Sequence, residues 1–230
     1  MTNDLAPGAH ASGSPPIKVI FLFSFYDIVI FLIGANMIDF RTDYGAEFDK
    51  VFSEIMDIEG IVMTNDPDDP GGLTICGISR AAHPQWSGWK YTTNFKLNTK
   101  VPLDFIVEYV AKFYYENFWL KYSCDKVPAK LGAEIFDQAI NPGPAIMTRN
   151  LQECLNALNY NTKTKDKDVE DLVVDGKWGK KTRTRLIEYA NKYNNFLAKA
   201  MNAKQATYYL SLSSSNVNMR KYVKGWMNRV

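Results

Sequence analysis

The stretch that most constrains the fold of this chain runs from residue 59 to residue 79, EGIVMTNDPDDPGGLTICGIS. Before it, apolar residues recur at steps of three and four, which predicts an amphipathic helix with one buried face. That face comprises Tyr44, Phe48, Val51, Phe52, Ile55 and Ile58. Glu59 is expected to end the helix, because Gly60 readily adopts the left-handed conformation of a helix terminus.

A turn-rich loop follows the predicted helix. Asn65-Asp66-Pro67 and Asp69-Pro70-Gly71-Gly72 are strong breakers of regular structure, and their Asx side chains can bond to the nearby backbone. Residues 73–78, LTICGI, then predict a short strand that could form one arm of a hairpin.

The positions of four polar residues suggest acid catalysis. A carboxylate at Glu59 would face the negative end of the helix dipole, which disfavours its ionised form. A general acid must carry its proton, and Asp68, Asp69 and Thr74 lie across the loop from it. Glycoside hydrolysis needs an acid near the scissile oxygen and a second group on the far side. A solvated helix end followed by a plain turn is the alternative explanation of the same residues.

The stretch also resembles a known signature. Glu59-Gly60, followed by Asp66-Pro67-x-Asp69-Pro70-Gly71-Gly72-x-Thr74-x-x-Gly77-Ile78-Ser79, is similar to glycoside hydrolase family 108. The resemblance implies a lysozyme-like fold and an N-acetylmuramidase of the kind encoded by phages and bacteria. It also implies catalytic roles for Glu59, Thr74 and one aspartate. Counting along the Glu-Asp-Thr triad of phage-type lysozymes selects Asp68, whereas alignment on Asp-Pro-Gly-Gly selects Asp69. The chain departs from the family pattern at Ile61, Val62 and Cys76.

The second half carries two further resemblances to the same family. Residues 131–144, LGAEIFDQAINPGP, are similar to its aromatic-Asp-x-x-x-Asn-x-Gly-Pro stretch, which makes Asn141 a candidate substrate-binding residue. Residues 174–182, VDGKWGKKT, are similar to a turn in its appended peptidoglycan-binding region. Aspartate and glycine favour a tight turn there, and Thr182 could start the next helix. A purely structural turn explains that motif equally well.

Aromatic residues after the loop are candidates for the sugar-binding surface. Trp86, Trp89 and Tyr91 could stack on the apolar faces of sugar rings, or could simply be packed beneath the loop. Residues 103–119 predict an amphipathic helix that is mainly core, and its Tyr114 could border the cleft.

Composition excludes several other chemistries. Three cysteines without CxxC spacing argue against a disulfide framework, and two histidines without a cysteine cluster make a zinc site improbable. We therefore expect no metal and no organic cofactor, and an amidase or peptidase is a poor interpretation. Residues 175–230 hold twelve bases and two acids, which favours an anionic surface such as the cell wall or simply solvated helix faces. Nucleic acid is not an expected partner, and we expect a monomer.

The N-terminal region differs from the rest. Residues 1–16 are small, polar and proline-rich, which predicts a flexible arm. Residues 17–38 are long and apolar enough for a signal anchor, with a buried helix as the alternative because Asp27 interrupts them. Such a protein would be made in the host cytoplasm and act in the periplasm and cell wall, with inner-membrane anchoring before release as one route.

The predicted organisation is a mainly α, lysozyme-like fold with a small β element. A catalytic region over residues 41–127 would precede a helical peptidoglycan-binding region over residues 128–230. Within the latter, residues 145–158 and 180–210 predict helices, the second interrupted near residues 191–195. The predicted function is that of a phage endolysin-type muramidase, and the alternative is a non-catalytic wall-binding or virion protein.

Overall fold

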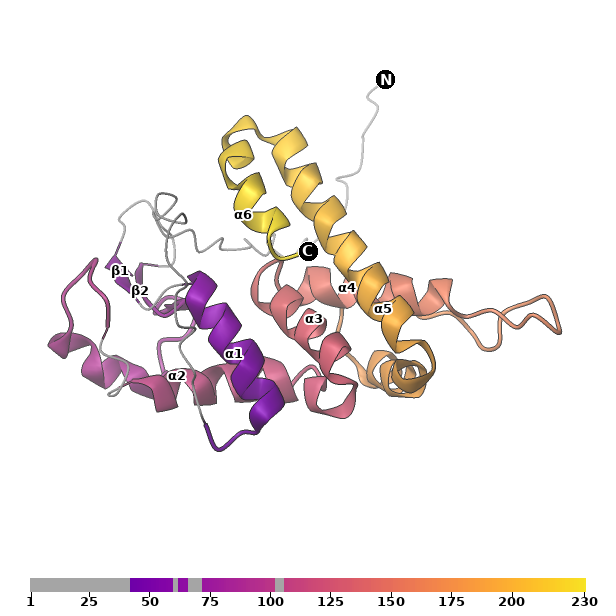
Figure 1. Cartoon of the computed structure of the whole chain (residues 1–230), viewed down its shortest axis with the longest axis horizontal. Helices are drawn as coiled ribbons and strands as arrows, with labels where there is room; N and C mark the ends of the chain where they lie inside the picture. Colours follow the sequence, from indigo (N-terminus) through magenta and orange to yellow (C-terminus); the bar gives the residue numbers. More distant parts are fainter. Residues whose placement is uncertain (1–41, 60–61, 66–71, 102–105) are drawn as a thin grey trace, which may run out of the picture.

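The computed structural model describes residues 42–59, 62–65, 72–101 and 106–230. In these ranges the chain is mainly helical, with one small antiparallel sheet (Figure 1). The elements in chain order are α1 (Ala46–Glu59), β1 (Met63–Asn65), β2 (Leu73–Ile75), β3 (Ile78–Ser79), η1 (Ser87–Asn94), α2 (Val107–Tyr114), η3 (Tyr115–Leu120), η4 (Cys124–Lys126), α3 (Ala129–Ile140), α4 (Pro144–Ala157), α5 (Lys180–Ser215), η5 (Val217–Tyr222) and α6 (Val223–Met227). The predicted mainly α fold with a small β element is confirmed.

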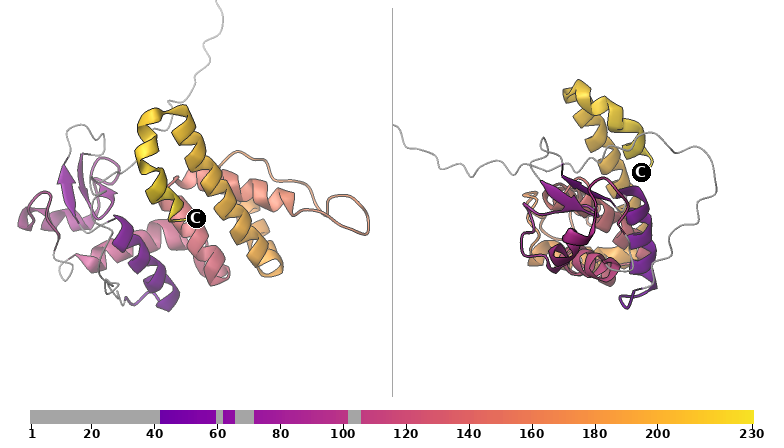
Figure 2. Two further views of the ribbon diagram at one scale, coloured as in Figure 1. Left: turned by 45° about the horizontal axis from the view of Figure 1, so that its top comes forward. Right: turned by 90° about the vertical axis from the view of Figure 1, so that its left-hand side faces the viewer.

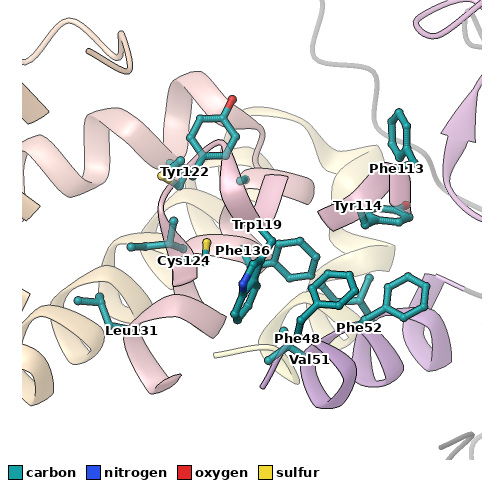
Figure 3. Close-up of a cluster of buried hydrophobic side chains, with 14 of the residues drawn as sticks. Phe48, Val51, Phe52, Phe113, Tyr114, Trp119, Tyr122, Cys124, Leu131 and Phe136 are labelled. Carbon is teal, nitrogen blue, oxygen red and sulfur yellow. The ribbon is translucent and has the colours of Figure 1, made fainter. Parts of the chain in front are cut away.

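Helix α1 has the predicted apolar face and the predicted end. Phe48, Phe52 and Ile55 are almost completely buried, and the helix stops at Glu59. Phe48 lies at the centre of a cluster of aromatic rings (Figure 3), with its ring centroid 5.7 Å from that of Trp119 and 5.8 Å from that of Phe136. Edge-to-face packing of this kind adds to the free energy gained by burying apolar area.

The sheet has the order β1-β2-β3, and a small hairpin is present as predicted. The single strand predicted over residues 73–78 is wrong, because residues 73–79 supply both arms of the hairpin. Cys76 and Gly77 make its two-residue turn with φ angles of 49° and 76°. Two successive positive φ values match a turn whose twist suits a tight hairpin, and Gly77 occupies the position where glycine is favoured. The sequence does not predict β1, because its three residues carry too little periodicity.

The helix predicted over residues 103–119 differs in its last part. Residues 102–105 lie outside the described ranges, α2 ends at Tyr114, and η3 continues as a π-helical turn. The prediction of a regular α-helix through Trp119 is therefore wrong in its last turn. A π turn shifts the angular position of the residues after it, and here Trp119 is buried with its ring 5.4 Å from Phe136.

The second half is a set of packed helices built on α3. Helix α3 contacts α1 on one side and α4 and α5 on the other. Helix α4 confirms the helix predicted over residues 145–158, and Pro142-Gly143 separates it from α3. Helix α5 confirms the predicted interruption, since Tyr193 has non-helical angles of φ −127° and ψ 19°. In Figure 2, α6 folds back along α5, where the Trp226 ring stacks on Tyr209 at 5.1 Å.

Several predicted features lie outside the described residues: the arm 1–16, the apolar segment 17–38, Gly60, Asp68 and Asp69. In the part of the chain that the structure describes, no helix combines the length and apolar character needed to cross a bilayer.

Candidate active site

The candidate site is built where α1 ends and the small sheet begins. Glu59 is the last residue of α1, and β1 starts four residues later at Met63. Strand β1 then pairs with β2 so that Thr64 lies opposite Thr74. Backbone pairing therefore brings the strand that carries Thr74 back to the segment that follows Glu59.

Thr74 is the one candidate catalytic residue whose side chain the structure describes. It is 5% exposed, and its hydroxyl donates a hydrogen bond to the Gly72 carbonyl at 3.2 Å. A hydroxyl that donates its proton keeps lone pairs that can accept a hydrogen bond from water. The side chains of Glu59, Asp68 and Asp69 are not among those described.

Tyr114 fixes the tip of the hairpin to α2. Its hydroxyl donates to the Cys76 carbonyl at 3.0 Å, and the side chain is 2% exposed. A Cβ atom at Gly77 would lie 2.5 Å from the Tyr114 oxygen, so this close approach also favours glycine. These contacts support a packing role for Tyr114, in place of direct contact with substrate.

Cys76 itself is buried in the turn. Burial raises the pKa of its thiol to about 12. The thiol is therefore protonated at neutral pH, which is the unreactive form. The same cause raises the pKa of Cys154 to about 11 and that of Cys124 well above the usual value.

The predicted tryptophans lie together but differ in exposure. Trp89 is 8% exposed and donates its indole N–H to the His83 carbonyl at 2.7 Å, which supports the packing alternative. Trp86 is half-buried, meets Trp89 edge-to-face at 5.0 Å and donates to the Tyr109 carbonyl at 3.3 Å. Of the two, Trp86 is the better candidate for contact with a sugar.

Asn141 lies at the end of α3, in a polar network that the sequence did not reveal. Its side-chain amide donates to the Asp137 carboxylate at 2.7 Å. That carboxylate also accepts from Arg229 at 3.1 Å and from Gln205 at 2.6 Å. Asp137 therefore joins α3 to α5 and to the chain's C-terminus. Asn141 helps to hold this joint, whatever it contributes to substrate binding.

A groove of about 800 Å³ lies between α1 and α3. Lys50 and Glu54 line it from α1, Lys130 and Glu134 from α3, and Arg229 at the C-terminus. This groove could not be predicted from the sequence, because i and i+4 charges on two separate helices look like ordinary solvated faces.

Glu134 is the carboxyl group in this groove with a clear pKa shift. Burial raises its pKa to about 7, and nearby Asp137 acts in the same direction. Gln138 limits the shift by donating a hydrogen bond to the carboxylate at 2.8 Å. Glu134 is therefore partly protonated near neutral pH.

The Val-Asp-Gly segment is a tight turn held by one glutamine. Gly176 has a φ of 71°, and its N–H donates to the Gln152 side-chain oxygen at 2.9 Å. The Gln152 amide donates in turn to Asp175 at 2.9 Å and to the Thr182 hydroxyl at 3.2 Å. The predicted turn is confirmed. Thr182 does not start the next helix, which begins at Lys180 after Gly179, and its hydroxyl accepts a hydrogen bond from Gln152.

A helix that ends at Glu59 and a hairpin that carries Thr74, both set on a helical body, suit a glycoside hydrolase of the helical type. Comparison with known families agrees. Residues 52–143 match the family model Glycosyl hydrolase 108, and residues 147–230 match the Predicted Peptidoglycan domain. The chain therefore carries a glycosyl hydrolase 108 domain over residues 52–143, followed by that peptidoglycan domain at its C-terminal end. It is a peptidoglycan hydrolase that acts on the cell wall.

Among solved structures, the "Structure of Brucella abortus SagA" is similar over 78% of this chain and 95% of that chain. The identity is 25% and the TM-score is 0.42. No curated protein matches the chain.

Proposed function

We propose that the chain is an N-acetylmuramidase, which hydrolyses the β-1,4 bond between N-acetylmuramic acid and N-acetylglucosamine. The observation that carries this proposal is the position of Glu59 as the final residue of α1, next to the hairpin of Thr74. The C-terminal end of a helix is negative, and a carboxyl group there keeps its proton more readily than in water.

In the proposed reaction, Glu59 protonates the glycosidic oxygen as the bond to the anomeric carbon breaks. Asp69 or Asp68 stabilises the oxocarbenium-like transition state or holds the attacking water, as carboxylates do in glycosidases. Thr74 positions that water, since its hydroxyl donates to Gly72 and can still accept a hydrogen bond. Water adds to the anomeric carbon and gives one proton to a carboxylate of the site, which leaves a new reducing end. Trp86 is the proposed sugar-stacking residue.

The test is a digest of purified peptidoglycan by the full-length protein, in which reducing ends and free amines are counted in the same samples. Wild type should release reducing ends only, and Glu59→Gln should lose nearly all of this activity while it keeps the fold. Removing a general acid typically costs about 10²–10⁴-fold in rate. Glu116→Gln is the matched control. Glu116 is exposed in η3, so this variant should cleave peptidoglycan like wild type.

Two outcomes would reject the proposal. Free amines without reducing ends would indicate cleavage of the peptide part, and retained activity in Glu59→Gln would remove that residue from the mechanism. Cleavage by wild type and not by Glu59→Gln would leave Asp68→Asn and Asp69→Asn as the next pair to separate.

We also propose that the enzyme serves a phage or prophage as an endolysin. The basic flank over residues 175–230, with twelve bases and two acids, supports contact with an anionic envelope. Anchoring through residues 17–38 is the proposed route to the periplasm. Induced expression of the full chain should lower the optical density of a bacterial culture, and deletion of residues 17–38 should delay that lysis. Lysis at an equal rate without the segment would rule out the anchoring route.

A further inference from the structure

The groove between α1 and α3 runs along the helix that carries Glu59. Its α1 wall extends to Ile55, and Glu59 follows one turn later, about 6 Å further along the helix axis at 1.5 Å per residue. Figure 1 shows α1 beside α3, with the C-terminus of the chain near their upper ends. A polymer bound at Glu59 can therefore send a branch into the groove.

The size of the groove suits a short ligand. Its volume of about 800 Å³ falls within the range of roughly 300–1,000 Å³ that is usual for small-molecule sites. Its floor is made of small or branched apolar side chains, which include Val51, Ile55 and Ala133. Such a floor complements methyl groups through apolar contact.

The rim of the groove carries charges of both signs. Lys50 and Glu54 are exposed on α1, Lys130 is exposed on α3, and Glu134 lies below it, half-buried. Arg229 closes one end, where it pairs with Asp137 at 3.1 Å. Carboxylates and ammonium groups on a ligand would both find partners of opposite charge on this rim.

This chemistry favours a peptide over a sugar. Among the described residues that line the groove, none is aromatic, so the stacking surface that sugar rings use is missing there. Peptidoglycan carries both kinds of chain, since a short stem peptide with alanine methyls, free carboxylates and a diamino acid branches from its glycan. The stem peptide matches both the apolar floor and the mixed charges of the rim, whereas the glycan can offer its N-acetyl methyl groups to the floor but carries no ammonium group for the rim.

We propose that this groove binds the stem peptide of peptidoglycan, with Lys50 and Lys130 facing its carboxylates and Glu54 and Glu134 facing its ammonium group. The inference rests on the proposed function, because it assumes that the glycan passes Glu59. The enzyme then recognises both the glycan and the stem peptide of its substrate. Glycan strands that bear peptides are then better substrates than bare strands.

The raised pKa of Glu134 agrees with this role. Its carboxyl group is partly protonated near pH 7, and Asp137, Lys130 and Asn202 act on it from α3 and α5, while Lys50 and Glu54 face the same groove from α1. An ammonium group bound beside Glu134 would favour the ionised form, so peptide binding should release a fraction of a proton.

The first experiment compares two substrates. Reducing ends are counted from intact peptidoglycan and from the same material after an amidase has removed its stem peptides. Wild type should cleave the stripped glycan with a kcat/KM about three- to tenfold lower, as expected for the loss of a few exposed or half-exposed ion pairs. The double variant Lys50→Gln/Lys130→Gln should lose this preference through KM and should cleave stripped glycan as wild type does. Lys163→Gln/Lys165→Gln, at exposed positions of the 159–171 connection, is the matched control and should keep the preference.

The second experiment needs no cleavage. Titration calorimetry with the isolated tetrapeptide L-Ala–D-Glu–diamino acid–D-Ala should show binding to wild type and to the control. The double variant should bind about threefold to tenfold more weakly. Equal binding to all three proteins, or equal kcat/KM of wild type on both substrates, would overturn the proposal. A protein that binds the tetrapeptide but releases no reducing ends from either substrate would overturn the muramidase proposal and leave the groove's ligand established.

Discussion

Two signature stretches of this chain rest on different kinds of support. The hairpin over residues 73–79 is joined through the Tyr114 hydroxyl to a layer of rings in which Tyr114, Phe136 and Phe48 are buried together (Figure 3). The Val-Asp-Gly turn over residues 174–176 instead hangs on the side chain of Gln152. Apolar contact is non-directional and graded, whereas an amide that serves several partners must be correctly placed for all of them.

The ring layer and the hydrogen-bonded turn tolerate different kinds of substitution. A ring layer tolerates changes that keep its volume, because several neighbours share each contact. A buried hydrogen-bonding side chain tolerates fewer changes, since its loss leaves the buried Thr182 hydroxyl and the half-buried Gly176 N–H without this partner. The hairpin over residues 73–79 therefore has the more adaptable support, and the Val-Asp-Gly turn has the more exacting one.

The largest expected effect is the loss of a central ring. Phe136 is 0% exposed and contacts the rings of Phe48, Tyr114 and Trp119. Phe136→Ala should lower the free energy of unfolding by about 3–5 kcal/mol, measured by urea denaturation. Phe196→Ala should change it by less than about 0.5 kcal/mol, because that ring is 65% exposed. Similar losses in both variants would mean that the ring layer is not what supports the hairpin.

The polar half is tested by replacing Gln152. Gln152→Leu keeps the size of the side chain and leaves Asp175, the Gly176 N–H and the Thr182 hydroxyl without their partner. We expect a loss of about 1–3 kcal/mol in the free energy of unfolding, the cost of leaving the buried Thr182 hydroxyl unsatisfied, because exposed Asp175 keeps the Lys177 N–H and half-buried Gly176 can turn to water. Gln85→Leu, at an exposed position, is the control. A loss below 1 kcal/mol would mean that Gln152 is replaceable and that the contrast between the two halves fails.

A third test uses pH to examine Glu134 in the groove between α1 and α3. The folded-state pKa of Glu134 is raised by burial from 4.5 to about 7. A carboxyl group with a raised pKa contributes its full stability below pH 4.5 and loses it as the pH rises through about 7. Glu134→Gln keeps the hydrogen bond from Gln138 without a charge, so it should unfold like wild type at pH 4.5. At pH 8 it should be more stable by on the order of 1–3 kcal/mol.

The pH experiment compares urea midpoints of both proteins at pH 4.5, 6 and 8. Glu153→Gln is the control on α4, where the carboxylate pairs with Lys204 at the surface. If the difference in urea midpoint between wild type and Glu134→Gln were the same at all three pH values, burial would not perturb the pKa of this carboxyl group.

The contrast also explains which parts of the molecule the sequence could predict. The buried face of α1, the end of that helix at Glu59 and the break in α5 near Tyr193 all follow from periodicity and local breakers. Those features are set by residues close together in the chain. The family motif likewise marked Thr74 and the Val-Asp-Gly turn, because each is a local pattern.

What could not be predicted depends on partners far apart in sequence. Gln152 bonds to residues more than twenty positions away, and Asp137 bonds to Arg229 across ninety-two positions. The groove joins two helices whose charges look solvent-facing when each is viewed alone. Tyr114 looked like a cleft residue in a helical pattern, and only its contact with Cys76 supports a packing role.

The smallest expected effect concerns the single hydrogen bond by which the ring layer holds the hairpin. Tyr114→Phe keeps the ring and removes the hydroxyl that donates to the Cys76 carbonyl. We expect a loss of about 1 kcal/mol in the free energy of unfolding and a several-fold drop in kcat, because Thr74 lies in the same hairpin. Tyr160→Phe, on an exposed ring, should change neither.

A second substitution, at Gly77, tests whether the Tyr114 hydroxyl contacts the tip of the hairpin. Gly77→Ala should cost about 1–2 kcal/mol from its positive φ, and more because the new Cβ would lie 2.5 Å from the Tyr114 hydroxyl. In the Tyr114→Phe background that oxygen is gone, so the same substitution should cost less. The double-mutant cycle therefore predicts a coupling in which the pair is more stable than the sum of its single losses. Strict additivity would mean that the hairpin tip does not contact α2 through this hydroxyl. Apolar contacts alone would then support the hairpin.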